Sequence, residues 1–182
     1  MEDYRVDSHK LIFHPDRVAA WMQGKTVYPI NAEISLAGAC NHRCIFCAVD
    51  YMGYEPKVLS KGIAHDIFQE MHLKGLKSVL FAGTGEPLLN KDAPDIINDT
   101  KMMGVDTALS KNGVLFTSDI AKECMESLSW IRFSTSAATE STYKKIHCGK
   151  DGDLERVFTN IYNATQIKQK YQLKTILNVQ IV

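Results

Sequence analysis

Three cysteines stand close together in one short segment, Cys40, Cys44 and Cys47, in the spacing C-x3-C-x2-C. Their thiolates are soft ligands that favour iron–sulfur clusters, zinc and copper(I). A cubane [4Fe–4S] cluster normally takes four cysteines, so a cluster held by three keeps one iron without a protein ligand. An open position of this kind can bind a reactant. The segment therefore predicts a metal centre that takes part in chemistry.

A zinc site is the alternative for the same cysteines. Structural zinc takes four ligands, often as two separated C-x2-C pairs. The sequence has no second pair, although His42 inside the segment or the distant Cys148 could supply a fourth ligand. We therefore predict an iron–sulfur centre. We expect Cys124 to lie in the core and Cys148 to be a surface thiol.

A second segment, residues 83–87, reads Gly-Thr-Gly-Glu-Pro and follows a short apolar run. Taken alone, its two glycines predict only a flexible turn between a strand and a helix. It is not a dinucleotide-binding fingerprint, because no third glycine follows at the required place. The carboxylate of Glu86 is suited to an ammonium group, and Pro87 keeps Glu86 out of the following helix.

Strand-like and helix-like segments alternate along the chain. Apolar runs predict strands over residues 30–36, 78–82, 105–110, 130–135 and 175–182. Helical spacing predicts a helix capped by Ser60 with Ile63, Ile67 and Met71 on its apolar face. Further helices are predicted over residues 92–103, from about residue 118 through Leu128, and from about residue 153. This alternation predicts an α/β fold of parallel strands joined by crossover helices.

The polar and glycine-rich segments all follow predicted strands. The cysteines come after the first strand, residues 83–87 after the second, residues 110–113 after the third, and residues 134–136 at the end of the fourth. In parallel sheets and barrels, ligands bind at the carboxyl ends of the strands. We therefore expect these segments to form one site.

The C-x3-C-x-aromatic-C segment, together with Thr84, Gly85 and Glu86, resembles the radical S-adenosylmethionine (SAM) superfamily over roughly residues 28–182. The resemblance implies a partial parallel (β/α) barrel, with five strands visible and the sixth missing from this sequence. It also implies two regions: an N-terminal extension with a short helix over residues 1–27, and a core domain, truncated at its C-terminus, over residues 28–182.

The resemblance further implies the cofactors and the residues that hold them. Cys40, Cys44 and Cys47 would bind a [4Fe–4S] cluster, whose open iron is chelated by the amino and carboxylate groups of SAM. Residues 84–86 occupy the family's Gly-Gly-Glu motif, which holds the SAM amino group, with threonine in place of the first glycine. The residues expected to bind SAM are Thr84, Gly85, Glu86, Ser110, Asn112, Ser134 and Ser136.

The activity implied by the resemblance is reductive cleavage of SAM to methionine and a 5′-deoxyadenosyl radical. This radical would take a hydrogen atom from an unidentified peptide, carbohydrate or other small molecule. A one-electron donor such as flavodoxin or ferredoxin would be a partner. The alternatives are a glycyl-radical activating enzyme within the family and, outside it, a non-catalytic zinc or iron–sulfur module.

Composition bounds the remaining partners. The 182 residues have a formal net charge of +0, with 45% hydrophobic and 23% charged residues, as in an ordinary globular domain. The basic residues are scattered and no apolar stretch reaches the length of a membrane span, so we expect neither nucleic acid nor a membrane as a partner. The N-terminus lacks an apolar signal segment, and clustered free cysteines fit a reducing compartment, so we expect a cytoplasmic protein.

Overall fold

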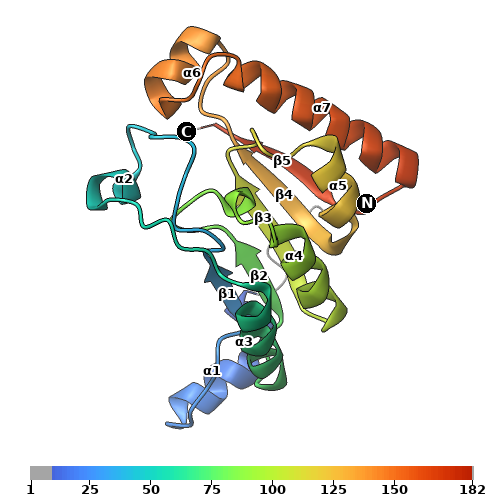
Figure 1. Cartoon of the computed structure of the whole chain (residues 1–182). Helices are drawn as coiled ribbons and strands as arrows, with labels where there is room; N and C mark the ends of the chain where they lie inside the picture. Colours follow the sequence, from blue (N-terminus) through green and yellow to red (C-terminus); the bar gives the residue numbers. More distant parts are fainter. Residues whose placement is uncertain (1–9, 182) are drawn as a thin grey trace.

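The computed structural model describes residues 10–181 and contains a sheet of five parallel strands (Figure 1). The strands pair in chain order and are β1 (Asn31–Ile34), β2 (Ser78–Phe81), β3 (Asp106–Lys111), β4 (Leu128–Ser134) and β5 (Ile176–Gln180). Each strand is parallel to the next. The sheet does not close on itself, so the predicted α/β fold with a partial barrel is confirmed.

All the described helices but the first connect successive strands. They are α1 (Pro15–Met22), α2 (Ala48–Met52), α3 (Lys61–Leu73), α4 (Ala93–Met102), α5 (Ser118–Cys124), α6 (Glu140–His147) and α7 (Asp153–Tyr171). Short 3-10 turns are η1 (Leu11–Phe13), η2 (Pro87–Leu89) and η3 (Met125–Ser127). In Figure 1, α3, α4, α5 and α7 lie along one side of the sheet, whereas α2 and α6 lie near the carboxyl ends of the strands.

The two faces of the sheet differ in chemistry because successive side chains of a strand point to opposite faces. On the face covered by helices, Phe81, Leu109 and Phe133 are fully buried in the main core. On the other face, Ser110, Arg132 and Asn178 are opposite one another in the register and partly exposed. The uncovered face is therefore polar toward the carboxyl ends of these strands.

Helix α3 begins as predicted but presents a different face to the sheet. The Ser60 hydroxyl caps it by accepting a hydrogen bond from the backbone N–H of Ile63 at 3.4 Å. Of the residues predicted on its apolar face, Met71 packs against the core, but Ile63 and Ile67 are 57% and 37% exposed. The buried residues are Ala64 and Phe68. The Phe68 ring packs edge-on against Phe81, with centroids 5.8 Å apart. Burial of this large ring decides the orientation of the helix.

Two further details differ from the prediction. Helix α5 ends at Cys124, and Leu128, expected on that helix, is instead the first residue of β4. The hydroxyl of Thr107 donates a hydrogen bond to the Ser127 carbonyl at 2.5 Å, which holds this junction against β3.

Helix α6 was not predicted from the sequence. It begins after Thr139, whose hydroxyl accepts a hydrogen bond from the backbone N–H of Thr142 at 3.3 Å.

The edges and ends of the chain leave two predictions open. Residues 1–9 of the predicted extension lie outside the described residues, and its short helix corresponds to α1. The division into two regions and a sixth strand beside β5 stay predictions.

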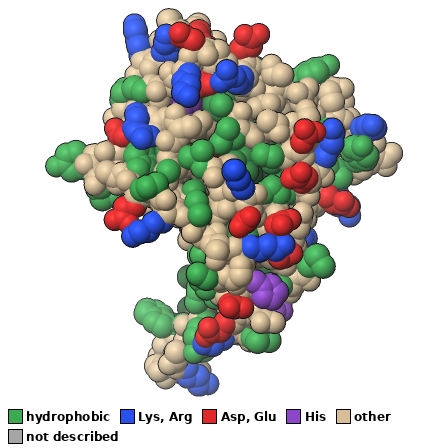
Figure 2. Space-filling view, in the orientation of Figure 1, with side chains coloured by type: hydrophobic (Ala, Val, Ile, Leu, Met, Phe, Trp, Pro, Cys, Tyr) green, Lys and Arg blue, Asp and Glu red, His purple; other side chains and the backbone are tan. Residues whose placement is uncertain are grey.

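None of the described helices is long and apolar enough to cross a lipid bilayer. Hydrophobic side chains are visible where α2 and α1 project from the body (Figure 2); on α2 they include Tyr51, 95% exposed.

Asn90 offers a test of how the site is anchored to the core. Its buried side-chain amide donates to the backbone carbonyls of Leu36, at 3.0 Å, and Leu59, at 2.7 Å. Asn90→Ala would leave both carbonyls without this donor. We expect the free energy of unfolding to fall by about 3 kcal/mol, measured by urea denaturation at unchanged m-value.

Asn98→Ala is the control, because the Asn98 amide donates to a single backbone carbonyl, that of Glu123, at an exposed site where water can replace it. Its Oδ1 also accepts from the Ser127 hydroxyl at 2.6 Å, at a partly buried site. We expect a loss within about 1 kcal/mol. Equal losses in the two variants would contradict the anchoring role of Asn90.

Candidate functional site

The cysteine segment leaves the end of β1 and runs to α2. Its path is fixed by backbone hydrogen bonds from Gly38 N–H to the Lys57 carbonyl at 2.7 Å and from Leu59 N–H to the Leu36 carbonyl at 3.0 Å. The thiols of Cys40, Cys44 and Cys47 are all partly buried. The segment therefore presents three thiols from a short, well-anchored loop.

Each thiol has a different polar neighbour. The Sγ of Cys40 accepts a hydrogen bond from the backbone N–H of His42 at 3.4 Å. The Sγ of Cys44 lies 3.2 Å from Nδ1 of His147, and the Sγ of Cys47 lies 3.4 Å from the hydroxyl of Tyr54. The three sulfurs thus differ in the polar groups that surround them.

The pKa values of the thiols show that they lie within each other's field. The pKa of Cys44 is raised to about 12, mainly by burial and to a smaller extent by the charges of Cys40 and Cys47. Burial also raises the pKa of Cys40. For Cys47, burial acts to raise the pKa, but hydrogen bonds from Tyr54 and backbone amides outweigh it and the pKa is lowered. Bound, positively charged iron would favour deprotonation of all three thiols and offset the repulsion that raises the pKa of Cys44.

The segment after β2 packs directly on the cysteine segment. The backbone N–H of Glu86 donates to the Ala39 carbonyl at 2.9 Å. A side chain at Gly85 would collide with the carbonyl oxygens of Ala37 and Ala39. Gly85 is therefore required for close approach of the two backbones.

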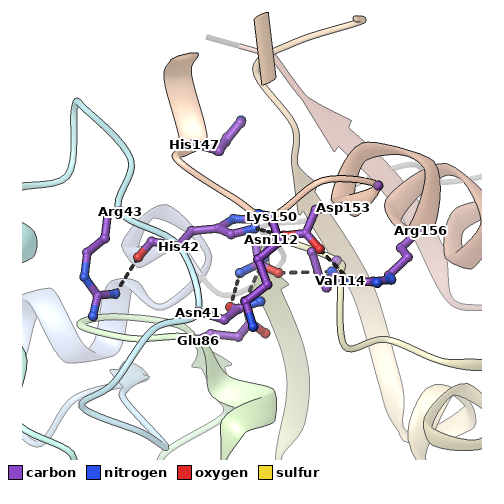
Figure 3. A network of polar contacts seen from close by, with 12 residues as sticks. Asn41, His42, Arg43, Glu86, Asn112, Val114, His147, Lys150, Asp153 and Arg156 are labelled. Atoms are coloured by element: carbon purple, nitrogen blue, oxygen red, sulfur yellow. Dashed lines mark hydrogen bonds and ion pairs between the residues drawn. The ribbon is translucent and has the colours of Figure 1, made fainter. Parts of the chain in front are cut away.

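The Glu86 side chain joins two further loops. It is only 2% exposed, and its carboxylate accepts hydrogen bonds from the backbone N–H of Asn112 at 2.8 Å and of Leu88 at 3.4 Å. The Asn112 side-chain amide donates to Oδ1 of Asn41 at 2.6 Å, in the cysteine segment (Figure 3). Burial raises the pKa of the Glu86 carboxyl, opposed by the Asn112 N–H and the charge of Lys111. Glu86 thus holds the first three strand-end loops together.

Lys111, next to Asn112 in sequence, is a buried cation in the same region. Its Nζ has no hydrogen-bond partner in the described part of the chain. It lies 3.5 Å from the ring centroid of Phe133 and 4.1 Å from that of Phe116. Burial lowers the pKa of Lys111, and the charge of Glu86 opposes this shift. The aromatic faces and Glu86 are what stabilise its positive charge.

The other predicted site residues are divided between the loops and the sheet. Thr84 bonds to the hydroxyl of Ser35 at 2.8 Å, at the end of β1. The Ser110 hydroxyl accepts from Nε of Arg132 at 3.0 Å, and the half-buried Ser134 lies opposite Gln180 in the register. The backbone N–H of Ser136 donates to Nε2 of His147 at 3.0 Å. Three of the predicted residues therefore lie against the cysteine segment: Gly85, Glu86 and Asn112. Ser136 is linked to Cys44 through the ring of His147. The remaining two serines, Ser110 and Ser134, lie on the sheet itself.

A second polar group at the site was not predicted from the sequence. Nε2 of His42 lies 3.2 Å from Oδ2 of Asp153, and both side chains are almost fully buried. Asp153 also accepts hydrogen bonds from the backbone N–H of Lys150 and the guanidinium of Arg156, both at 2.8 Å (Figure 3). Burial lowers the pKa of His42, opposed by its hydrogen bond to Asp153.

The C-terminal end of α6 binds the cysteine segment through the backbone. The N–H of Arg43 donates to the His147 carbonyl at 3.1 Å, and the N–H of Ile45 donates to the Ile146 carbonyl at 2.9 Å. Ligand atoms of His42, Cys44 and His147 all lie within 4.8 Å of one another. Burial, followed by the charge of His42, lowers the pKa of His147 to about 4. The segment is therefore held on one side by the β2 loop and on the other by α6.

Comparison with known proteins identifies the class of this fold and site. The family model for the radical SAM superfamily matches residues 34–179. The chain therefore belongs to the radical SAM superfamily. Membership in this superfamily of enzymes implies a [4Fe–4S] cluster and SAM as cofactors, as the sequence predicted.

Among curated proteins, the chain is similar to two enzymes named for nucleotide substrates. It is 32% identical over 112 residues to an S-adenosylmethionine-dependent nucleotide dehydratase of Lacinutrix mariniflava, covering 59% of this chain and 23% of the relative. It is 31% identical over 138 residues to a probable GTP 3′,8-cyclase of Saccharolobus solfataricus, covering 75% and 44%. The chain thus spans less than half the length of either relative.

Solved structures confirm the fold. Streptococcus suis SuiB, bound to its precursor peptide SuiA, aligns with a TM-score of 0.70 at 14% identity, covering 97% of this chain and 39% of that one. The enzyme anSMEcpe with bound AdoMet aligns with a TM-score of 0.63 at 17% identity, covering 84% and 43%. At these identities the likeness concerns the fold alone.

The contact at Gly85 provides a test of how the loops are arranged. In Gly85→Ala the new methyl group would push the cysteine segment away from the β2 loop. We expect the free energy of unfolding to fall by about 1–3 kcal/mol and less iron to be bound after anaerobic reconstitution with iron and sulfide. Urea denaturation and iron analysis measure the two effects.

Gly62→Ala in α3 is the control, because a methyl group there meets open space. We expect full iron content and a gain of up to about 1 kcal/mol. Full iron content and normal stability in Gly85→Ala would show that the two backbones do not need this close approach.

Proposed function

We propose that this protein is a radical SAM enzyme in which a [4Fe–4S] cluster held by Cys40, Cys44 and Cys47 cleaves SAM to a 5′-deoxyadenosyl radical that removes a hydrogen atom from the substrate. The observation that carries the proposal is that the segment bearing three partly buried thiols packs, through the carbonyls of Ala37 and Ala39, on the Gly85–Glu86 backbone at the carboxyl ends of parallel strands. Three protein ligands would leave one iron available to the amino acid end of SAM.

We further propose that SAM lies along the strand ends, against Thr84, Gly85, Glu86, Ser110, Asn112, Ser134 and Ser136. Gly85 lets the cysteine segment lie directly on the β2 loop, which brings the proposed cluster close to the proposed SAM site. Glu86 supplies negative charge near the position expected for the SAM ammonium group. The chain's own contribution is to position the cofactors and to keep water and stray hydrogen donors away.

The substrate is proposed to be a small molecule or peptide bound on the uncovered face of the sheet. The relatives named for nucleotides favour a small molecule, and the peptide-bound neighbour has the same fold. Arg132 lies on this face, bonded to Ser110 and 5.9 Å from the Trp130 ring. The chain is also 39% identical to a probable RNA methyltransferase of Chlorobaculum tepidum. This match covers only 35% of the chain and therefore gives little support to an RNA substrate. A flavodoxin or ferredoxin is the proposed electron donor.

A non-catalytic zinc module is the second candidate, favoured by the group formed by His42, Cys44 and His147. Zinc there would use Cys44, so the same thiol could not also hold the proposed cluster. Metal analysis and the absorption spectrum of anaerobically purified protein separate the candidates, because a zinc protein is colourless and an iron–sulfur protein is not.

Cys44→Ala tests the cluster ligands. We expect it to lose both bound iron and the formation of 5′-deoxyadenosine from SAM under reducing conditions, because two thiolates cannot hold the cluster. Cys148→Ala is the matched control: Cys148 is exposed, and we expect normal iron content and SAM cleavage. Loss of iron in Cys148→Ala, or its retention in Cys44→Ala, would refute the proposed ligand set.

Glu86→Gln tests the proposed role of the carboxylate in SAM binding. Glutamine keeps the size of the side chain and one acceptor oxygen, which can still accept the short hydrogen bond from the Asn112 N–H. It removes the charge and gives up the longer bond from the Leu88 N–H. We expect the cluster to be retained and SAM affinity to fall about tenfold or more, since a hydrogen bond to a charged group contributes roughly 1.5–3 kcal/mol. Equilibrium binding of SAM to the reconstituted protein measures the change.

Glu55→Gln is the control, because the Glu55 side chain is exposed and, within residues 10–181, forms an ion pair with Lys57. Its SAM affinity should not change. If Glu86→Gln binds SAM as tightly as Glu55→Gln does, the carboxylate has a purely structural role.

A further inference from the structure

His147 is buried beside the cysteine segment at the end of α6. It is 1% exposed, and its ring packs on Tyr143, with centroids 4.4 Å apart, and edge-on against Phe46 at 5.9 Å. Its backbone carbonyl accepts the N–H of Arg43. Both the ring and the backbone of His147 are therefore fixed relative to the cysteines.

The hydrogen bonds of the ring determine which nitrogen carries the proton. A backbone N–H can only donate, and the N–H of Ser136 points at Nε2 of His147 at 3.0 Å. Nε2 is therefore the acceptor. In a neutral imidazole the other nitrogen then bears the hydrogen. That nitrogen, Nδ1, lies 3.2 Å from the Sγ of Cys44. The ring is set to donate an N–H···S hydrogen bond.

We propose that His147 donates this hydrogen bond to the Cys44 thiolate and thereby raises the reduction potential of the cluster. The inference rests on the proposed function, in which Cys44 is a cluster ligand. Hydrogen bonds to the sulfurs of an iron–sulfur cluster are among the factors that set its potential, because a donor stabilises the added negative charge of the reduced state. His147 acts through Cys44 and is therefore a positioning residue.

The effect is directed at one of the three sulfurs. The neighbour of Cys40 is the backbone N–H of His42, and that of Cys47 is the hydroxyl of Tyr54. Removing the imidazole of His147 would leave both of these contacts in place. A change in potential can then be assigned to the contact at Cys44.

His147→Leu and His147→Asn form the test pair. Leucine removes the donor, whereas the asparagine amide takes the place of Nδ1 and keeps an N–H near the sulfur. After anaerobic reconstitution we measure iron and sulfide content, and then the midpoint potential by a titration followed with electron paramagnetic resonance (EPR). We expect His147→Leu to hold the cluster at a lower potential than the unaltered protein, with His147→Asn close to the unaltered value. An unchanged or higher potential in His147→Leu overturns the inference.

His147→Gln serves if leucine disrupts the site. Its longer amide can still accept the Ser136 N–H but places no donor at the position of Nδ1. We expect the same lowered potential, and an unchanged or higher one overturns the inference.

Pulsed EPR of the reduced, unaltered protein labelled with 15N-histidine provides a test without any substitution. A weak coupling to histidine nitrogen, together with an exchangeable proton near the cluster, is expected for a hydrogen bond to sulfur. A strong coupling, as for nitrogen bound to iron, or no coupling at all overturns the inference.

These outcomes separate the inference from the proposal on which it rests. If the unaltered protein forms no cluster, the proposed function fails. If it forms a cluster that cleaves SAM, but the potential does not depend on His147, only the role of His147 fails.

Discussion

The site depends on one buried carboxylate. Glu86 is buried in the protein interior. Burying an ionised side chain is costly unless the charge is hydrogen-bonded. Its partners are the backbone N–H groups of Asn112 and Leu88, and its own N–H is bonded to Ala39 of the cysteine segment. Breaking any of these bonds would leave a charge or a dipole unpaired inside the protein. The loops after β1, β2 and β3 are therefore held in one arrangement.

The cysteine segment has little hydrophobic anchoring of its own. Ile45 and Phe46, between the second and third cysteines, are 72% and 58% exposed. Its geometry comes instead from polar contacts on two sides: the β2 loop at Ala39, and α6 at Arg43 and Ile45. The residues that surround the sulfurs are thus supplied by parts of the chain remote from the cysteines.

The order of the elements could be predicted because it follows local rules. Each buried parallel strand is a short apolar run, and each crossover helix has helical spacing and a recognisable cap, as at Ser60. The orientation of α3 could not be predicted, because Ile63 and Phe68 both belong to plausible apolar stripes. The choice between them is made by the Phe81 ring on another element. The end of α5 at Cys124 was likewise decided by pairing of the following residues with β3.

The sequence by itself determined the class of chemistry, because three thiols in C-x3-C-x2-C spacing and the Gly85–Glu86 pair lie in short, recognisable segments. Only the tertiary structure decided what surrounds those thiols. His147 reaches Cys44 across 103 positions, and Asp153 reaches His42 across 111. Contacts at such separations have no periodicity or spacing that a sequence pattern can show. They arise because parallel strands bring all their carboxyl ends, and the helices that follow, to one edge of the sheet.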